Sequence, residues 1–301
     1  MKPIEDVRRA FGRGLCVLAA TAGLAACSVL AEDVEYLGSF VWPRTSHGGG
    51  GFSALELDAN GQAFVTISDR ARQTTGTLIR SGGRLTGIDA APLRPLTDPS
   101  GHPLPIEAAD SEGLALLPDG RTCISFEGNH RVWCYDRDGT ARATPPLPDV
   151  FDGYTNRGIE TLAADAEGRL YAIPEHSGGL TTPFPVMRLD NDAWTQPFAL
   201  PRRGGHLPVG ADFGPDGRLY VLERLFTGYG FSSRVRRFDV SDNGLTNETI
   251  LIDTPALRHD NLEGLAVWQD ASGATRLTMI SDDNEFALQR TEIVEYRVTR
   301  P

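Results

Sequence analysis

The sequence predicts an all-β protein, a β-propeller of five blades. Short apolar runs separated by Asp-Gly and Asn-Gly turns are typical of antiparallel strands joined by tight hairpins. A unit of such strands recurs about every 50 residues, and no stretch shows a long helical period of apolar residues. Four strands per unit at this period are typical of a propeller blade. The units begin at Gly51, Glu112, Gly158, Gly210 and Asn261.

Two other architectures remain open at this point. A sixth blade would exist if residues 84–106 or 139–155 contained a weaker unit, and two packed β-sandwiches would also use many short strands. Because the turns fall at matching places in all five units, we favour the ring.

The first 31 residues resemble an export signal, with a basic start followed by an apolar run over residues 15–26 that is too short to span a bilayer. The sequence LAAC resembles a bacterial lipobox and would make Cys27 the lipidated first residue of the mature chain. Cleavage after Ala31 is the alternative. We therefore expect a periplasmic protein, lipid-anchored or free, with its propeller domain over residues 34–301.

The fifth unit supplies only three strands before the chain ends. Residues 34–42, VEYLGSFVW, precede the first unit and form a further strand. We expect this strand to pair with the last blade, because that pairing closes the ring and removes its open edges.

Two cysteines remain in the second unit beyond the signal-like segment. Cys123 and Cys134 flank the Gly128-Asn129 turn symmetrically, so they can face each other across neighbouring strands. In an oxidising compartment this pair is expected to form a structural disulfide, with free core thiols as the alternative.

Composition restricts the partners. The chain has 301 residues, 40% of them apolar, a formal net charge of −11 and an isoelectric point near 5.0. This charge argues against nucleic acid and anionic membrane surfaces and suits a metal ion or a small substrate bound by a local cluster. Lys2 is the only lysine, so Schiff-base chemistry is excluded. We expect a monomer that contacts a membrane only through an N-terminal lipid.

Carboxylates recur at two places in the unit. In a blade the first strand lines the channel and the second runs back, so the start of one and the end of the other share a face of the ring. Single acids at strand ends usually cap turns, but turn chemistry does not require the glutamates of SEG, GIE and LEG. The starts carry Glu112, Glu160, Asp212 and Glu263, and the ends carry Asp69, Glu127, Glu175, Glu223, Asp282 and Asp283.

So many carboxylates at one opening repel one another unless they are protonated, paired or bound to metal. Oxygen ligands from several blades suit Ca²⁺, and Mg²⁺ or Mn²⁺ less well. The ligands expected from the repeat are Glu112, Glu160, Asp212, Glu263 and Asp282.

Arginines and possible bases accompany these acids. Arg70, Arg157 and Arg224 would either bind an anionic substrate or pair with the adjacent acids. For proton transfer the candidates are Glu127, Glu175 and the neighbouring His176.

The segments GFSALELDANGQAFVTISDR, DSEGLALLPDGRTCISFEGN, NRGIETLAADAEGRLYAIPE, YVLER and NLEGLAVW with MISDDNE together resemble the bacterial phytase-like family, described as having "esterase-like activity of phytase". The resemblance runs from about residue 36 to residue 296. It implies an exported β-propeller and a phosphoester or ester hydrolase. The acidic opening also looks like that of metal-dependent lactonase propellers, which hold Ca²⁺ in the channel.

Two functions remain open. One is a metal-dependent hydrolase, in which the metal polarises the substrate and a carboxylate acts as general base. The other is a non-enzymatic envelope protein whose propeller binds a ligand or protein and whose cation is structural. The sequence lacks the G-x-S-x-G, HExxH, P-loop and G-x-G-x-x-G motifs, so no nucleophile is recognised.

Overall fold

A computed structural model describes residues 33–43, 50–148 and 158–299. The export signal, Cys27 and Arg157 lie outside these ranges. Among the described residues, no helix is long and apolar enough to cross a membrane.

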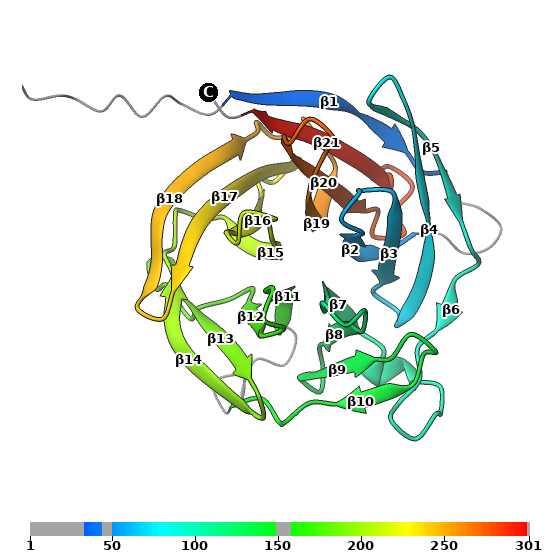
Figure 1. Ribbon diagram of the computed structural model, residues 1–301, viewed down its shortest axis with the longest axis vertical. Coiled ribbons are helices and arrows are strands. Elements are labelled where there is room, and N and C mark those ends of the chain that lie inside the picture. The colour runs from blue at the N-terminus through cyan, green and yellow to red at the C-terminus, as the bar shows by residue number, and fades with distance from the viewer. Residues whose placement is uncertain (1–32, 44–49, 149–157, 300–301) are drawn as a thin grey trace, which may run out of the picture. The chain divides into compact units, whose positions relative to one another are not determined.

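Five antiparallel sheets are arranged around a central axis, which confirms the prediction of five blades (Figure 1). Residues 84–106, where a sixth blade could have been hidden, include two strands of the first blade. The innermost strands of the five blades are β2 (Phe52–Leu57), β7 (Ser111–Leu116), β11 (Ile159–Ala164), β15 (Leu207–Phe213) and β19 (Asn261–Gln269).

The remaining strands follow outward in each blade. Blade 1 continues with β3 (Ala63–Ser68), β4 (Arg72–Ser81) and β5 (Arg84–Ala90), with β6 (Arg94–Pro95) beside β4; blade 2 with β8 (Thr122–Phe126), β9 (Arg131–Tyr135) and β10 (Ala141–Ala143); blade 3 with β12 (Leu170–Pro174), β13 (Phe184–Asp190) and β14 (Ala193–Leu200); blade 4 with β16 (Leu219–Phe226), β17 (Phe231–Ser241) and β18 (Gly244–Asp253); and blade 5 with β20 (Thr275–Asp282), β21 (Glu292–Thr299) and β1 (Asp33–Val41). A 3₁₀ turn, η1 (Ile106–Ala108), precedes β7.

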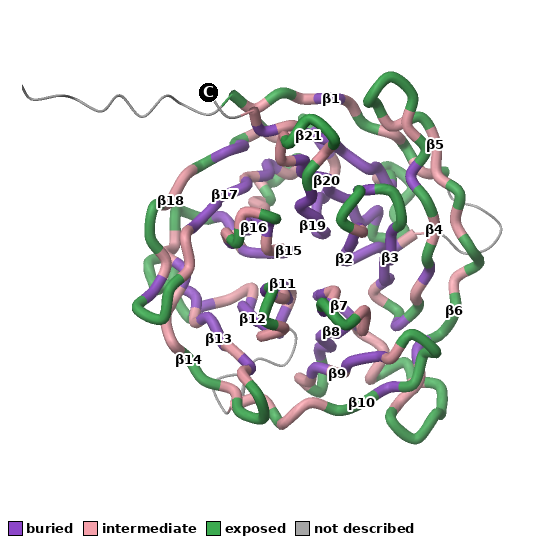
Figure 2. The backbone as a smooth tube through the Cα atoms, in the orientation of Figure 1, coloured by how far each residue is buried: buried purple, intermediate pink, exposed green. Residues whose placement is uncertain are grey.

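Burial falls from the channel to the rim (Figure 2). All six residues of β2 are buried, and so are eight of the nine residues of β19, whereas β4 alternates between buried and exposed positions. The inner strands are buried on both faces because each blade packs against its neighbours. Core clusters accordingly span adjacent blades, as where Leu55 packs with Ala266 and Ile280. This packing explains the nearly continuous apolar runs of the inner strands.

The ring closes where blade 5 meets blade 1. Strand β1 pairs antiparallel with β21 over its whole length, so the prediction that residues 34–42 complete the last blade is confirmed. Across the same junction the Arg80 guanidinium of blade 1 lies 2.6 Å from the buried Glu295 carboxylate of blade 5. The Arg276 guanidinium contacts that carboxylate at 2.9 Å, and both guanidiniums lie over the Trp268 ring.

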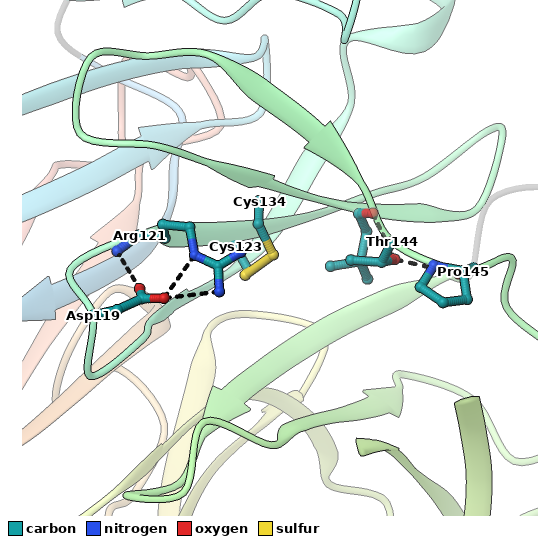
Figure 3. Close-up of a disulfide and its surroundings, with 7 residues drawn as sticks. Asp119, Arg121, Cys123, Cys134, Thr144 and Pro145 are labelled. Atoms are coloured by element: carbon teal, nitrogen blue, oxygen red, sulfur yellow. Dashed lines mark hydrogen bonds and ion pairs between the residues drawn. A yellow bond between two sulfur atoms is a disulfide. The ribbon is translucent and has the colours of Figure 1, made fainter. Parts of the chain in front are cut away.

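Cys123 and Cys134 are directly opposite each other on β8 and β9 and are joined by a disulfide (Figure 3). Both are buried in the core between blades 2 and 3. In the turn before β8, the guanidinium of Arg121 pairs with the Asp119 carboxylate at 2.8 Å. The position of the bridge within a core indicates a structural role.

We expect Glu295→Gln to destabilise the fold strongly. The substitution leaves two guanidiniums without their carboxylate at a buried site, and breaking such a pair costs about 3–5 kcal/mol in the free energy of unfolding. Urea denaturation measures this loss. The matched control is Glu35→Gln, which removes an exposed pair with Arg297 and should cost less than about 1 kcal/mol. Equal effects of the two substitutions would refute a stabilising role for this junction.

Candidate functional site

Each innermost strand carries a β-bulge at the same level, and the bulges define an inner ring of side chains. The register of β11 with β12 shifts between Ile159 and Thr161, so Glu160 has no partner in the ladder. A bulged residue is re-aimed relative to the regular alternation. The equivalent residues in blades 1 to 5 are Ser53, Glu112, Glu160, Val209 and Glu263.

A second ring lies one step further out, on the second strand of each blade. In each blade, the residue just before the bulge pairs with a residue of the second strand, and the residue after that partner belongs to this ring. In blade 2, Ser111 precedes the bulge and pairs with Phe126, so the ring member is Glu127. The equivalent residues in blades 1 to 5 are Asp69, Glu127, Glu175, Arg224 and Asp282. We call the opening formed by these two rings the acidic mouth. It brings together seven carboxylates and one guanidinium.

Blade 4 departs from the sequence prediction at this level. Arg224, not Glu223, holds the equivalent position, because Glu223 still pairs with Pro208 in the ladder. The fully buried Glu223 carboxylate instead contacts the fully buried Arg236 of β17, with Nε and Oε2 2.9 Å apart. The prediction that Glu223 faces the opening is therefore wrong by one residue.

Asp212 is also misplaced by the sequence prediction. It lies near the end of β15, opposite Tyr220 at the start of β16, and so belongs to the other opening of the channel. There its Oδ2 accepts a hydrogen bond from the Val267 backbone N–H at 2.6 Å. Glu56 is the equivalent residue of blade 1, and the two acids line the same cavity of about 1040 Å³. Asp212 cannot share a site with the glutamates of the acidic mouth.

Arg224 is the cation around which half of the acidic mouth is arranged. Its guanidinium contacts the carboxylates of Glu263, Glu175 at 3.4 Å and Glu160 at 3.7 Å, and donates to the Asn261 side chain at 2.8 Å. Although burial lowers the pKa of Arg224, these carboxylates raise it above its ordinary value. The guanidinium is therefore fully charged and already occupied by protein partners.

A second group of acids lies together in blade 2. Carboxylate oxygens of Asp110, Glu112 and Glu127 lie within 4.8 Å of one another, in an arrangement that could hold a metal ion. Asp110 was not among the predicted ligands. A signal was present, because Asp110 in DSEG and Asn261 in NLEG both stand two residues before the bulged glutamate.

Burial and mutual repulsion make the carboxylates of the acidic mouth weak acids. Burial is the main cause in each case. With further contributions from Glu160 and Glu263, it raises the pKa of Glu112 well above the ordinary value. The pKa of Glu263 rises to about 7 despite the opposing effect of Arg224. The pKa of Asp69 rises to about 7, with a contribution from the charge of Asp282, and the pKa of Asp282 itself rises to about 6.

The remaining predicted residues lie toward the edge of the opening. Nδ1 of His176 is 3.0 Å from Oε2 of Glu175, so the two candidates for proton transfer are in contact. Arg70 is 64% exposed and pairs with Glu285 at 2.5 Å. Of the predicted ligands, Glu112 lies in the cluster with Asp110, Glu160 and Glu263 contact Arg224, and Asp282 interacts with Asp69.

The fold and this opening define a five-bladed β-propeller with an acidic mouth at one end of its channel. The family model for phytase-like proteins, described as "Esterase-like activity of phytase", matches residues 47–285. The chain belongs to this family. No curated protein sequence matches it.

Solved structures with similar folds have diverse functions. Regucalcin from Agrobacterium tumefaciens, a calcium-binding protein, is 13% identical with a TM-score of 0.48, and the match covers 83% of this chain and 91% of that one. Virginiamycin B lyase from Staphylococcus aureus is 12% identical with a TM-score of 0.48, covering 89% and 100%. A gluconolactonase from Xanthomonas campestris is 16% identical with a TM-score of 0.45, covering 82% and 72%. Similarities of this size do not identify a reaction.

We expect the stability of the protein to fall as pH rises when no divalent cation is present. Carboxylates with a raised pKa hold protons in the folded state that the unfolded chain releases. Their stabilising contribution is therefore complete below about pH 4 and is lost as pH rises through about 6–7. Thermal unfolding in chelator should give a lower Tm at pH 8 than at pH 5.

The double variant Asp69→Asn with Asp282→Asn should reduce this dependence, since it removes two of the groups responsible. Glu167→Gln, in an exposed turn of blade 3, is the matched control and should leave the dependence as it is. A Tm that rises between pH 5 and pH 8 in chelator would contradict the repulsion described for the acidic mouth.

Proposed function

We propose that the protein is an exported hydrolase of esters or phosphoesters that uses a divalent cation, Ca²⁺, at the acidic mouth. The observation that carries the proposal is the cluster of Asp110, Glu112 and Glu127. Ca²⁺ lies about 2.3–2.6 Å from its oxygen ligands, so two ligands of one ion can be about 5 Å apart. The observed limit of 4.8 Å fits this requirement.

The charge of the cluster also fits a cation. Three hard carboxylate donors suit Ca²⁺, whereas Mg²⁺ demands a tighter octahedral geometry and Mn²⁺ is a further alternative. Glu160 and Glu263 lie close enough to Glu112 to raise its pKa. A cation at this cluster would relieve that repulsion, which supports binding there.

When bound, the cation would polarise the carbonyl or phosphoryl oxygen and lower the pKa of a bound water. Glu175 is the proposed general base, because the cluster takes Glu127 as a ligand and His176 contacts the Glu175 carboxylate. Arg224 holds Glu160, Glu175 and Glu263 in place. It is a positioning residue in this proposal and not the substrate anchor that the sequence suggested.

One observation favours the alternative of a non-enzymatic binding protein. Arg224 already neutralises part of the acidic mouth, so these carboxylates can be stabilised in the folded protein without taking part in a reaction. In that case a cation at Asp110, Glu112 and Glu127 would be structural, and the opening would bind a ligand without reacting with it.

We expect Glu112→Gln to abolish the response to calcium and the hydrolytic activity together. The variant keeps the shape of the side chain but removes one ligand charge, so added Ca²⁺ should raise the Tm of the wild type and leave that of the variant nearly unchanged. Activity is measured on a panel of esters and phosphoesters, with and without chelator. It should fall at least a hundredfold in the variant, because the cation that polarises the substrate is lost; each tenfold loss corresponds to about 1.36 kcal/mol of barrier.

The control for this experiment is Asp119→Asn, in an exposed turn at the other end of the blade, which should keep both properties. If calcium stabilises the wild type but no substrate is turned over, the binding-protein alternative replaces the hydrolase. If calcium has no effect and Glu112→Gln keeps full activity, the metal-dependent reaction is refuted.

Export and lipid attachment are proposed from the signal-like start of the chain, and the Cys123–Cys134 disulfide agrees with an oxidising compartment. We expect the expressed full chain to fractionate with membranes and to carry a lipid on Cys27. Cys27→Ser should release it into the soluble periplasmic fraction. Mass spectrometry showing an unmodified chain that starts at Glu32 would instead establish cleavage after Ala31.

A further inference from the structure

A half-apolar pocket of about 370 Å³ opens beside the acidic mouth on blade 4. Its lining combines apolar and polar residues. The apolar lining residues are Leu207, Leu225, Phe226 and Phe231, and the polar ones are Glu175, Arg224, Asn261 and Asn284. Binding sites for small organic molecules commonly combine a mostly apolar wall with a few polar groups in this way.

The apolar wall exists because blade 4 has a longer hairpin than its neighbours. Strands β3, β8 and β12 end at the residue equivalent to Glu223, but β16 continues three residues further, to Phe226. Phe226 pairs with Phe231 across the hairpin, with ring centroids 5.2 Å apart. The extension thus places two aromatic rings above the level of Arg224.

The tip of this hairpin is held by the loop that follows β18. The Leu257 backbone N–H donates to the Phe231 carbonyl at 3.1 Å. Gly230 lies so close to Leu257 that a Cβ at this position would be 2.4 Å from Cδ2 of the leucine. These contacts hold the start of β17, and with it Phe231, against the loop.

Arg224 connects the pocket to the acidic mouth. Its guanidinium carbon lies 6.0 Å from the centroid of the Phe231 ring, while its nitrogens contact Asn261 and Glu175. A ligand in the pocket would consequently have its polar end among the carboxylates and its apolar end against the two phenylalanines. Phe226 is 60% exposed without a ligand, so covering it would bury apolar surface.

The charges of the described residues oppose a highly anionic substrate. Seven carboxylates line the acidic mouth, and Arg224, the one guanidinium among the described residues of its two rings, is engaged by three of them. Arg70, the other described arginine that was predicted to bind an anion, is paired with Glu285. A polyphosphorylated polyol would meet repulsion at each additional phosphate and would leave the aromatic wall uncovered.

We propose that this pocket receives the aromatic group of a neutral carboxylic ester whose ester group reaches the acidic mouth. The proposal rests on the proposed function for the turnover of that ester, but the aromatic subsite is a separate statement about binding. Two neighbouring rings favour an aromatic group, because such rings stack or meet edge to face. Phe226 and Phe231 are then residues that determine specificity.

Hydrolysis of benzyl acetate and methyl acetate tests the preference, since the two leaving alcohols have similar acidity and differ in the ring. With the full-length protein and Ca²⁺, we expect a higher kcat/KM for benzyl acetate. Phe226→Ser should lower kcat/KM for benzyl acetate about tenfold and leave methyl acetate unchanged. The matched control is Leu288→Ser, an 85% exposed residue in the loop after β20 that does not line the pocket, and it should affect neither ester.

A binding measurement separates the subsite from the reaction. Calorimetry with N-benzylacetamide and N-methylacetamide, which the protein is not expected to cleave, should show tighter binding of the benzyl compound, and Phe226→Ser should remove the difference. If this holds while neither ester is hydrolysed, the subsite stands and the proposed hydrolase fails. If both amides bind equally to the wild type, or if Phe226→Ser weakens both equally, the aromatic subsite is refuted even where esters are hydrolysed.

Discussion

Closure of the ring is the constraint on which the rest of this structure depends. The carboxylates of the acidic mouth come from blades whose equivalent residues are about 50 positions apart in the chain, and only a closed ring brings them to one axis. Closure is achieved by pairing the first strand with the last and by the buried Glu295 carboxylate shared between Arg80 and Arg276. The last blade is thereby held by contacts between the two ends of the described chain.

Closure alone would not point side chains into the channel. The five inner strands are buried on both faces, and regular alternation would leave little room for charged groups among them. A bulge at the same level of every inner strand re-aims one residue per blade, and in three blades that residue is a glutamate. The bulges thus convert a packed core into a polar opening at a single level.

Electrostatic cost shapes the opening that results. Burial of several carboxylates together is unfavourable unless protons, arginine or a cation compensate. Arg224 compensates on the side of blade 4, where it takes a position that carries an acid in every other blade. On the side of blade 2, the acids Asp110, Glu112 and Glu127 lie close enough together to hold a cation, which is why we propose the cation site there. The extended hairpin above Arg224 makes the same blade the apolar side of the opening.

The sequence by itself predicted five blades, with six left open, and it predicted the strand that closes the ring and the facing positions of Cys123 and Cys134, because these follow from period, turn chemistry and symmetry about a turn. It also identified the glutamates of SEG, GIE and LEG as residues of one opening. Only the tertiary structure decided that Arg224 replaces Glu223, that Asp212 belongs to the other opening, and that Asp110 joins Glu112 and Glu127. The physical reason is register. A shift of one residue moves a side chain to the other face of a strand, and a bulge makes such a shift without a clear signal in the local sequence.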